Sequence, residues 1–395
     1  MNGPLSGVRV LDLSVMLSGP YATALLADQG ADVIKLERPG PGDIARLLGV
    51  SVNGVSAMFV ACNRGKRSIV VDVQQPDGVE IVRSIAAGVD VFVQNFRPGV
   101  VDQLGIGYQD IREINADVVY ASISAFSGEG PYRRRAAYDP VIQSYSGFAM
   151  NQADPDDGAP VFLKQSAADK VTSLFASQAI TAALFARERG AGGQHLELSM
   201  MDAAVSFLWA DAAGNEVLLA SDGSLPSSPV AGLHPVRFAD GWGSVSPTTD
   251  KDFAAICRVF GIELGLAERV TSMTERMKNR AAANEVVDLW HARAADMTMA
   301  EADARLSAEG LSFAWVMTNK DLVHDRHAQA IGLFEEFDHP VAGKARLPRH
   351  PTRFGATAAK LAAPSPRLGE HTDEILEGIG LGPRIVELRA RGVVA

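Results

Sequence analysis

Apolar and polar positions in the first 125 residues follow two alternating periods. Short, mostly apolar runs at residues 8–13, 32–37, 68–73, 89–94 and 118–123 have the length of buried strands. Residues 19–28, 76–87 and 108–114 lie between these runs and carry apolar side chains at helical spacing. Strands that alternate with helices predict a mainly parallel sheet with helices on its faces, which is an α/β fold.

The longest apolar segment, residues 171–186, is broken only by Thr, Ser and Gln, and it predicts a helix inside the core. Gly190 is expected to end this helix. Two further glycines at 192 and 193 then predict a turn into a short strand at residues 195–200, followed by another helix.

An acidic residue, Asp169, stands at the start of the long helix. Ser166 precedes it by three residues, so the pair fits the capping-box pattern that satisfies free N–H groups at a helix start. The same position places an ionised carboxylate in the positive end of the helix dipole, which is expected to lower its pKa and to favour a nucleophile at neutral pH. The cap and the nucleophile are compatible interpretations of one residue.

The first strand, helix and strand have the order of a dinucleotide-binding unit. Their turn, Leu17-Ser18-Gly19-Pro20, lacks the three-glycine spacing that lets a pyrophosphate approach the backbone. Glu37 does end the second strand where a ribose-binding acid would stand. Because the glycines are missing, NAD is not expected as a ligand.

Basic residues gather in the loops at the ends of the predicted strands. Such charges are mostly solvated surface. Open α/β sheets nevertheless bind ligands at their strand ends, so an anionic ligand with phosphates is the alternative interpretation of these residues. They are Arg38, Arg64, Lys66, Arg67, Arg97 and Arg133 to Arg135.

The amino-acid composition limits the classes of partner that are expected. The formal net charge of −10 argues against a nucleic-acid-binding surface and against anionic membranes, so small molecules are the expected partners. Cys62 and Cys257 form no metal or redox spacing, which favours a cytoplasmic location. No leader or membrane-spanning segment is predicted. All eight histidines lie at or beyond His195, so the first half has no imidazole for general-base work and no metal site is expected.

The 395 residues have room for two domains. The loop at residues 221–229 is a plausible linker to a second region at about 230–330, which has helical patterns at 251–259 and 281–295. Residues 338–366 are rich in Pro, Ala and Arg and are expected to run as an extended surface segment. A short helix is expected near residues 383–391.

Seven segments carry a resemblance that their order and spacing make specific. They are LSGVRVLDLS at the start, GPYATALLADQGADVIKLERPGPGD at 19–43, NRGKRSIVVD at 63–72, QNFRPGVVDQLGIGY at 94–108, YDPVIQSYSG at 138–147, ADKVTSLFASQAITAALFARERGAGGQHLELSMMDA at 168–203 and LGEHTDEIL at 368–376. Together they resemble the family III CoA-transferases, also called the CaiB/BaiF family, which includes formyl-CoA and carnitine CoA-transferases. The resemblance covers nearly the whole chain.

The resemblance implies an acyl-CoA:carboxylate CoA-transferase with Asp169, the aspartate of the Ala-Asp-Lys segment, as its catalytic nucleophile. Coenzyme A and acyl-CoA would be substrates, with a carboxylic acid as acceptor and no tightly bound cofactor. Matching segments place coenzyme A against Leu17, Ser18, Arg38, Val71, Asp72, Val73, Gln74, Asn95, Phe96, Arg97, Ala136, Ala137, Tyr138 and Asp139.

The resemblance also implies a homodimer of two chains interlocked like linked rings. Each chain would have a large domain with a Rossmann-like parallel sheet, built from residues 1–200 and a return segment at 331–395. Residues 201–229 would be a linker, and residues 230–330 a smaller α+β domain. The active site would lie where the large domain of one chain meets the small domain of the other.

Two alternatives remain open. One is a 2-methylacyl-CoA racemase of the same superfamily, whose His-Asp pair corresponds to Tyr138-Asp139, so that this chain lacks the histidine. The other is a catalytically silent CoA-binding protein in which Asp169 only caps its helix. Leu17 replaces a glutamine of the formyl-CoA transferases, and only Gly241-Trp242-Gly243 partly matches their glycine-rich loop. An acid less polar than oxalate is therefore expected as substrate.

Overall fold

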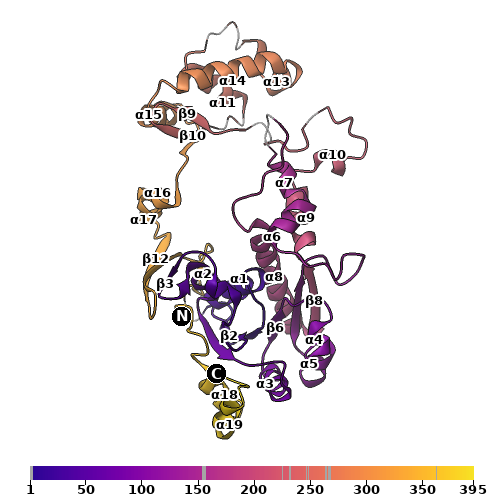
Figure 1. The fold of residues 1–395 in the computed structure, drawn as a ribbon. Helices are drawn as coiled ribbons and strands as arrows, with labels where there is room; N and C mark the ends of the chain where they lie inside the picture. Colours follow the sequence, from indigo (N-terminus) through magenta and orange to yellow (C-terminus); the bar gives the residue numbers. More distant parts are fainter. Residues whose placement is uncertain are drawn as a thin grey trace. The chain divides into compact units, whose positions relative to one another are not determined.

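The computed structural model describes residues 3–153, 157–224, 226–230, 233–245, 247, 249–262, 265, 268–361 and 363–395. The chain divides into two compact units, a larger one of residues 1–219 and 332–395 and a smaller one of residues 220–331. The larger unit thus combines both ends of the chain, drawn in indigo and in yellow (Figure 1). Leu225, in the loop predicted as a linker, lies outside the described residues.

A six-stranded sheet forms the centre of the larger unit, in the order β5-β2-β1-β6-β7-β8. All five pairings are parallel, so the predicted parallel α/β sheet is confirmed. Numbered along the chain, this order is the 3-2-1-4-5-6 arrangement of dinucleotide-binding folds, and all six carboxyl ends lie at one edge. The strands are β1 (Arg9–Asp12), β2 (Asp32–Glu37), β5 (Lys66–Val70), β6 (Val91–Gln94), β7 (Val119–Ser124) and β8 (Gln194–Ser199).

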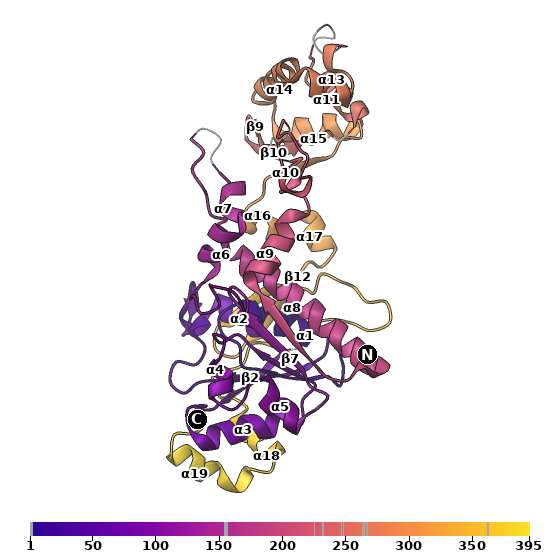
Figure 2. The same ribbon diagram turned by 90° about the vertical axis from the view of Figure 1, so that its right-hand side faces the viewer.

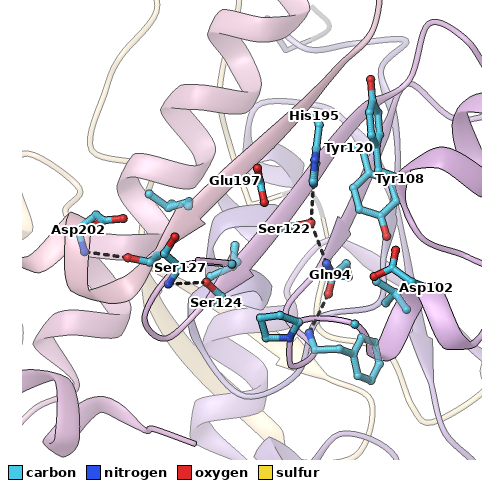
Figure 3. A pocket seen from close by; sticks show the side chains of 18 residues that line it. Gln94, Asp102, Tyr108, Tyr120, Ser122, Ser124, Ser127, His195, Glu197 and Asp202 are labelled. Atoms are coloured by element: carbon cyan, nitrogen blue, oxygen red, sulfur yellow. Dashed lines mark hydrogen bonds between the residues drawn. The ribbon is translucent and has the colours of Figure 1, made fainter. Parts of the chain in front are cut away.

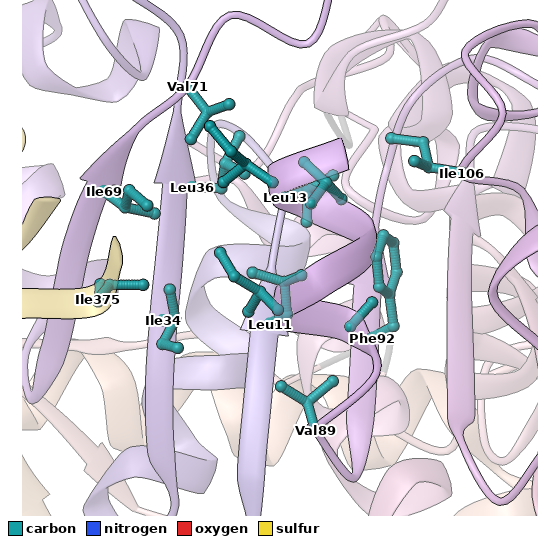
Figure 4. Packing of buried hydrophobic residues seen from close by; sticks show 14 of the residues in the cluster. Leu11, Leu13, Ile34, Leu36, Ile69, Val71, Val89, Phe92, Ile106 and Ile375 are labelled. Atoms are coloured by element: carbon teal, nitrogen blue, oxygen red, sulfur yellow. The ribbon is translucent and has the colours of Figure 1, made fainter. Parts of the chain in front are cut away.

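Helices cover both faces of the sheet, because successive strand residues point to opposite sides. Val10 and Val91 face a core shared with α1 and α8, whereas their neighbours Leu11 and Phe92 face a second core shared with α3, α5, α18 and α19. Figure 4 shows the second core. The helices are α1 (Ser18–Asp28), α8 (Ala167–Ala186), α3 (Pro76–Ala86), α5 (Tyr108–Ile114), α18 (Thr372–Gly378) and α19 (Ile385–Ala390).

The last residues of the chain complete the second core. Ile375 from α18 packs among strand residues such as Ile34 and Ile69 (Figure 4). At the edge strand, Val71 forms an antiparallel bridge with Val394. The N–H of the next residue along, Asp72, donates to the carbonyl oxygen of Val393 at 2.8 Å. Residues some 300 positions apart therefore depend on one another for burial.

The smaller unit is built around a three-stranded antiparallel sheet in the order β11-β10-β9. Phe238, Phe253 and Trp290 are buried together in its core. Its elements are β9 (Val236–Phe238), β10 (Gly241–Val245), β11 (Phe313–Trp315), α11 (Asp250–Val259), η3 (Glu268–Val270), α13 (Met273–Lys278), α14 (Arg280–Ala294), α15 (Met299–Ala308), α16 (Asn319–His324) and α17 (Arg326–Ala330).

The remaining elements of the larger unit are mostly short (Figure 2). They are η1 (Ile44–Leu47), β3 (Ser51–Val52), β4 (Val55–Ser56), α2 (Ala57–Asn63), α4 (Val100–Gln103), α6 (Asp139–Ser146), α7 (Phe148–Asn151), η2 (Arg187–Ala191), α9 (Met200–Trp209), α10 (Gly214–Val217), β12 (Phe334–His339), β13 (Gly343–Pro348) and η4 (Gly382–Arg384). β12 and β13 pair as an antiparallel hairpin, where the sequence predicted the start of an extended segment.

Two expectations about individual elements are wrong. The strand predicted at residues 68–73 ends at Val70, because its neighbour β2 ends at the paired Glu37 and leaves residues 71–73 without a parallel partner. The helix predicted to lie inside the core is only partly buried by its own chain, in which Leu174 and Phe185 are 54% and 64% exposed. Among the described residues, no helix combines the length and apolar character that crossing a membrane requires.

Candidate active site

Asp169 lies in the first turn of α8, and Ser166 is the N-cap residue of this helix. Ser166 makes no side-chain capping hydrogen bond, and the reciprocal capping box that the sequence pattern predicts does not form. The capping interpretation of Asp169 is therefore wrong. Its side chain instead lines a cavity at the carboxyl edge of the sheet.

Hydrogen bonds from three directions fix Asp169. Its backbone N–H donates to Oδ2 of Asp139 at 3.1 Å. The hydroxyl of Ser173, one helical turn later, donates to the carbonyl oxygens of Asp169 at 2.9 Å and Ser18 at 2.7 Å. Ser18, the first residue of α1, lines the same cavity, and its hydrogen-bonding groups favour the ionised form of Asp169. The carboxylate thus lies between the N-terminal ends of two helices.

Asp139, the first residue of α6, is buried beside Asp169. Its Oδ1 accepts a hydrogen bond from Nε2 of Gln143 at 2.5 Å, and its Oδ2 accepts the Asp169 N–H. Gln143 is itself held, because its Oε1 accepts the N–H of Leu163 at 2.9 Å. Both oxygens of Asp139 therefore accept hydrogen bonds from neighbouring residues.

Burial raises the pKa of Asp169, and the negative charge of Asp139 raises it further. Hydrogen bonds from Ser18 act in the opposite direction, and the resulting pKa is about 7. The expectation that the helix dipole lowers this pKa is wrong, because the loss of water around the carboxylate outweighs the dipole. Near neutral pH, Asp169 is thus a mixture of carboxylic acid and a carboxylate more basic than an exposed one.

The cavity that Asp169 lines has a volume of about 410 Å³. It brings together many of the residues that the resemblance assigns to coenzyme A. They come from the start of α1, the loop after β6 and the loop before α6: Ser18, Asn95, Phe96, Arg97, Ala136, Ala137, Tyr138 and Asp139.

The other assigned residues do not line this cavity. Leu17 is buried as the N-cap residue of α1. The Nε of Arg38 donates to the carbonyl oxygen of Gly42 at 3.2 Å, and its side chain is exposed. Val71, Asp72, Val73 and Gln74 follow β5, at the carboxyl edge that also holds the cavity.

Two arginines line the cavity without having been assigned to it, Arg133 and Arg135. The guanidinium of Arg135 lies over the rings of Tyr132 and Tyr145, with its central carbon 5.3 Å and 4.9 Å from their centroids. Within the described residues, the guanidinium groups of Arg97 and Arg133 pair with no carboxylate. The sequence contains three consecutive arginines at 133–135, and this run indicated that basic side chains would line the cavity.

A second cavity, of about 150 Å³, shares Phe96, Pro98, Ile123 and Ser124 with the first. Figure 3 shows side chains that line this second cavity. A hydrogen-bonded chain crosses it: Gln94 Nε2 donates to Ser122 Oγ at 2.9 Å, and Ser122 Oγ lies 2.9 Å from His195 Nε2. Burial lowers the pKa of His195. Among the described residues, no histidine lines the cavity of Asp169, so the His-Asp pair of a racemase does not form there.

Neither metal nor thiol chemistry is indicated. In the part of the chain that the structure describes, no group of three or more His, Cys, Asp or Glu side chains is arranged to hold a metal ion. Cys62 and Cys257 are free and buried. Burial raises the pKa of the Cys62 thiol to about 11, which leaves it protonated at neutral pH.

A parallel sheet in the dinucleotide-binding order, with a carboxylate and guanidinium groups in a cavity at its carboxyl edge, is typical of α/β enzymes that act on anionic small molecules. Comparison with known proteins defines the family. Residues 5–372 match the profile of CoA-transferase family III, and the chain belongs to this family.

Individual relatives agree with this assignment. The chain is 34% identical to the succinyl-CoA:glutarate CoA-transferase of Mus musculus over 382 residues, which cover 95% of this chain and 86% of the relative. It is 30% identical to a formyl-CoA:oxalate CoA-transferase of Rhodopseudomonas palustris, with 96% and 94% covered. The crystal structure of a CaiB/BaiF family protein from Brucella suis superposes with a TM-score of 0.82 at 32% identity, over 96% of this chain and 100% of that one.

The predicted resemblance is therefore confirmed, and with it the predicted activity. The protein is a CoA-transferase that moves CoA from an acyl-CoA to a carboxylic acid. The relatives from Mus musculus and Rhodopseudomonas palustris are named as CoA-transferases, and they lend no support to the racemase or to the silent CoA-binding protein.

Proposed function

We propose that Asp169 carries the transfer as a covalent nucleophile, held in a cavity that binds the CoA thioester. This proposal rests on the different contacts that the carboxylates of Asp139 and Asp169 make. Asp139 uses both oxygens to hold Asp169 and Gln143, whereas the Asp169 carboxylate faces the cavity. A positioned and partly desolvated carboxylate is what nucleophilic catalysis on a thioester requires.

The proposed reaction has four steps. An oxygen of Asp169 attacks the thioester carbonyl, so that a C–O bond forms, the C–S bond breaks, and a mixed anhydride and the CoA thiolate result. The thiolate attacks the Asp169 carbonyl carbon, which releases the donor acid as a carboxylate and leaves an aspartyl-CoA thioester. The acceptor carboxylate attacks this thioester and expels the thiolate again. Thiolate attack on the acceptor carbonyl then forms the new acyl-CoA and restores Asp169.

Atoms and charge balance in these steps without water, an oxidant or a tightly bound cofactor. The protein has to orient the reacting groups, exclude water from the site and bind the long CoA group. Binding of this group holds the reacting atoms close together. We propose that Arg97, Arg133 and Arg135 bind its phosphates, because guanidinium groups suit phosphate geometry and these three line the cavity. In this proposal residues 1–200 and 331–395 form the CoA-binding domain, and residues 230–330 form a smaller domain.

The acceptor is proposed to be a dicarboxylic acid longer than oxalate. The relatives are named for glutarate and oxalate as acceptors. Leu17 stands in place of the glutamine of the formyl-CoA transferases and is buried outside the cavity, so the polar group of that glutamine is absent from the start of α1. Succinyl-CoA as donor with glutarate as acceptor is therefore the first substrate pair to assay.

A covalent adduct tests the nucleophile directly. Incubation with succinyl-CoA followed by hydroxylamine is expected to modify one peptide, the one that contains Ala168-Asp169-Lys170, because an aspartyl thioester or anhydride is far more electrophilic than a free carboxylate. Mass spectrometry of the digested protein locates the adduct. Modification of another peptide, or none with a substrate that turns over, contradicts the assignment of Asp169.

We propose that the protein is an interlocked homodimer. Large apolar side chains stand exposed on α8 and α9 of the single chain, among them Phe185 at 64% and Phe207 at 54% exposed, and a second copy would cover them. Interlocked chains cannot separate without unfolding, so dilution is expected to yield no folded monomer. Analytical ultracentrifugation with circular dichroism over a dilution series measures this, and a folded monomer contradicts the proposal.

A further inference from the structure

The loop between β1 and α1, residues 13–17, leads directly into Ser18, which lines the cavity with Asp169 and is tied to it by the Ser173 hydroxyl, at 2.7 Å from the Ser18 carbonyl oxygen and 2.9 Å from that of Asp169. Met16 in this loop has a φ of 70°, in the left-handed region that residues with a side chain rarely adopt. Such a conformation costs free energy and persists only where surrounding contacts hold it. The loop is therefore held by its neighbours, and the structure shows which residues they are.

Asn95, directly after β6, holds Val15. Its Oδ1 accepts the Val15 N–H at 2.8 Å, and its Nδ2 donates to the Val15 carbonyl oxygen at 2.8 Å. The side-chain amide thus exchanges two hydrogen bonds with the backbone of a single residue 80 positions earlier. Asn95 lines the cavity, but its amide is engaged by the loop.

A buried ion pair holds the residues on either side of Val15. Nζ of Lys35 lies 3.0 Å from Oδ2 of Asp43, and both side chains are 0% exposed. Oδ1 of Asp43 accepts the N–H of Met16 at 3.0 Å, and Lys35 Nζ donates to the carbonyl oxygen of Ser14. Neither charged residue lines the cavity, so any influence on the reaction acts through the loop.

The loop is pressed against the start of α1. A Cβ atom on Gly19 would lie 2.3 Å from the side chain of Ser14, so there is no space for the loop to shift toward the helix. Leu17, the N-cap residue of α1, offers no side-chain acceptor to the first N–H groups of the helix. Pro20, the third residue of the helix, has no N–H, and the N–H of Ser18 favours the ionised form of Asp169.

We infer that Lys35 and Asp43, together with Asn95, are positioning residues that hold residues 14–17 so that Ser18 hydrogen-bonds the nucleophile. The inference rests on the proposed role of Asp169. If the loop relaxes, the hydrogen bonds from Ser18 weaken. Ionised Asp169 then loses stabilisation, while burial and Asp139 continue to oppose its charge.

The double variant Lys35→Met with Asp43→Asn tests this inference, because it removes the pair without leaving one charge buried alone and without changing the net charge. The acid limb of the pH profile of kcat/KM is expected to move up by about one pH unit, the effect of weakened hydrogen bonds to a carboxylate. Misplacement of the nucleophile is expected to lower kcat roughly 10- to 100-fold, with a smaller change in KM. Charged groups that share the cavity with Asp169 stay in place: Arg97, Arg133, Arg135 and Asp139.

The buried pair of Arg64 and Asp28, 2.6 Å apart and at the C-terminal end of α1, supplies a matched control. Arg64→Met with Asp28→Asn is expected to lower the melting temperature comparably and to leave the acid limb unchanged. Should the first double variant not fold, Asn95→Ala removes both bonds to Val15 without exposing a charge, and the same upward shift is expected.

An unchanged acid limb together with a kcat within twofold of wild type, in whichever of these variants folds, overturns the positioning role. Absence of the hydroxylamine-trapped adduct in the wild-type protein overturns the proposed nucleophile instead. The two failures are therefore distinguishable.

Discussion

Replacing Asp169 with asparagine is expected to reduce kcat for CoA transfer by a factor on the order of 10⁴ or more, as loss of a covalent catalytic group typically does. The amide has nearly the shape of the carboxylate but cannot form a mixed anhydride with the acyl group. Binding of CoA is expected to change little, because the residues proposed to hold it remain. Transfer from succinyl-CoA to glutarate, followed by chromatography of the acyl-CoAs, and calorimetric titration with CoA measure the two quantities.

Asp202→Asn is a matched control. Asp202 also lies in the first turn of a helix, α9, but it lines the second cavity. The control variant is expected to keep a kcat close to wild type. A kcat within tenfold of wild type in the Asp169→Asn variant would mean that another group reacts with the thioester.

The pH dependence of the transfer is the second large effect expected. Because the pKa of Asp169 is about 7 and only the ionised form attacks, kcat/KM is expected to fall about tenfold for each pH unit below 7. Asp139→Asn removes the neighbouring negative charge, which lowers the pKa of Asp169 and moves the acid limb to lower pH. Initial rates at low acyl-CoA concentration between pH 5 and 8.5 measure both. A flat profile would show that burial does not control this group.

Stability gives an independent check on the same pKa. The pKa of Asp169 is higher in the folded protein than in the unfolded chain, so the folded state binds this proton more tightly. The stability that this proton contributes is complete at acid pH, below the unfolded pKa, and is lost as the pH rises through about 7. Asp169→Asn removes the ionisation, so the variant is expected to gain thermal stability over wild type at pH 8 more than at pH 5.

The sequence predicted the fold well where a local pattern was enough. β2 at Asp32–Glu37 has the predicted bounds, because a dense apolar run between polar turns is a local signal. The end of β5 was wrong because it depends on where the neighbouring strand ends, which no local pattern records. The hairpin of β12 and β13 lies in a segment of weak periodicity, and its pairing was not visible either.

The candidate site, like the fold, was predicted from the sequence only in part. Asp169 was identified through the resemblance, and the structure places it in a cavity with Ser18, Arg97 and Asp139. Its raised pKa could not be predicted, because the helix start shows the dipole but not the burial or the second carboxylate 30 residues away. The hydrogen-bonded chain of Gln94, Ser122 and His195 joins three neighbouring strands, so it became visible only with the strand order.

The pairing of the chain's last residues with β5 has a consequence for synthesis. Val70 and its partner Thr372 are 302 positions apart, and α18 and α19 cover part of the apolar face that β5, β2 and β1 present. At 5–20 residues per second a ribosome needs roughly 15–60 s to add that stretch. Throughout this interval the nascent sheet exposes apolar side chains to solvent, so it is a natural substrate for chaperones that shield unfinished domains.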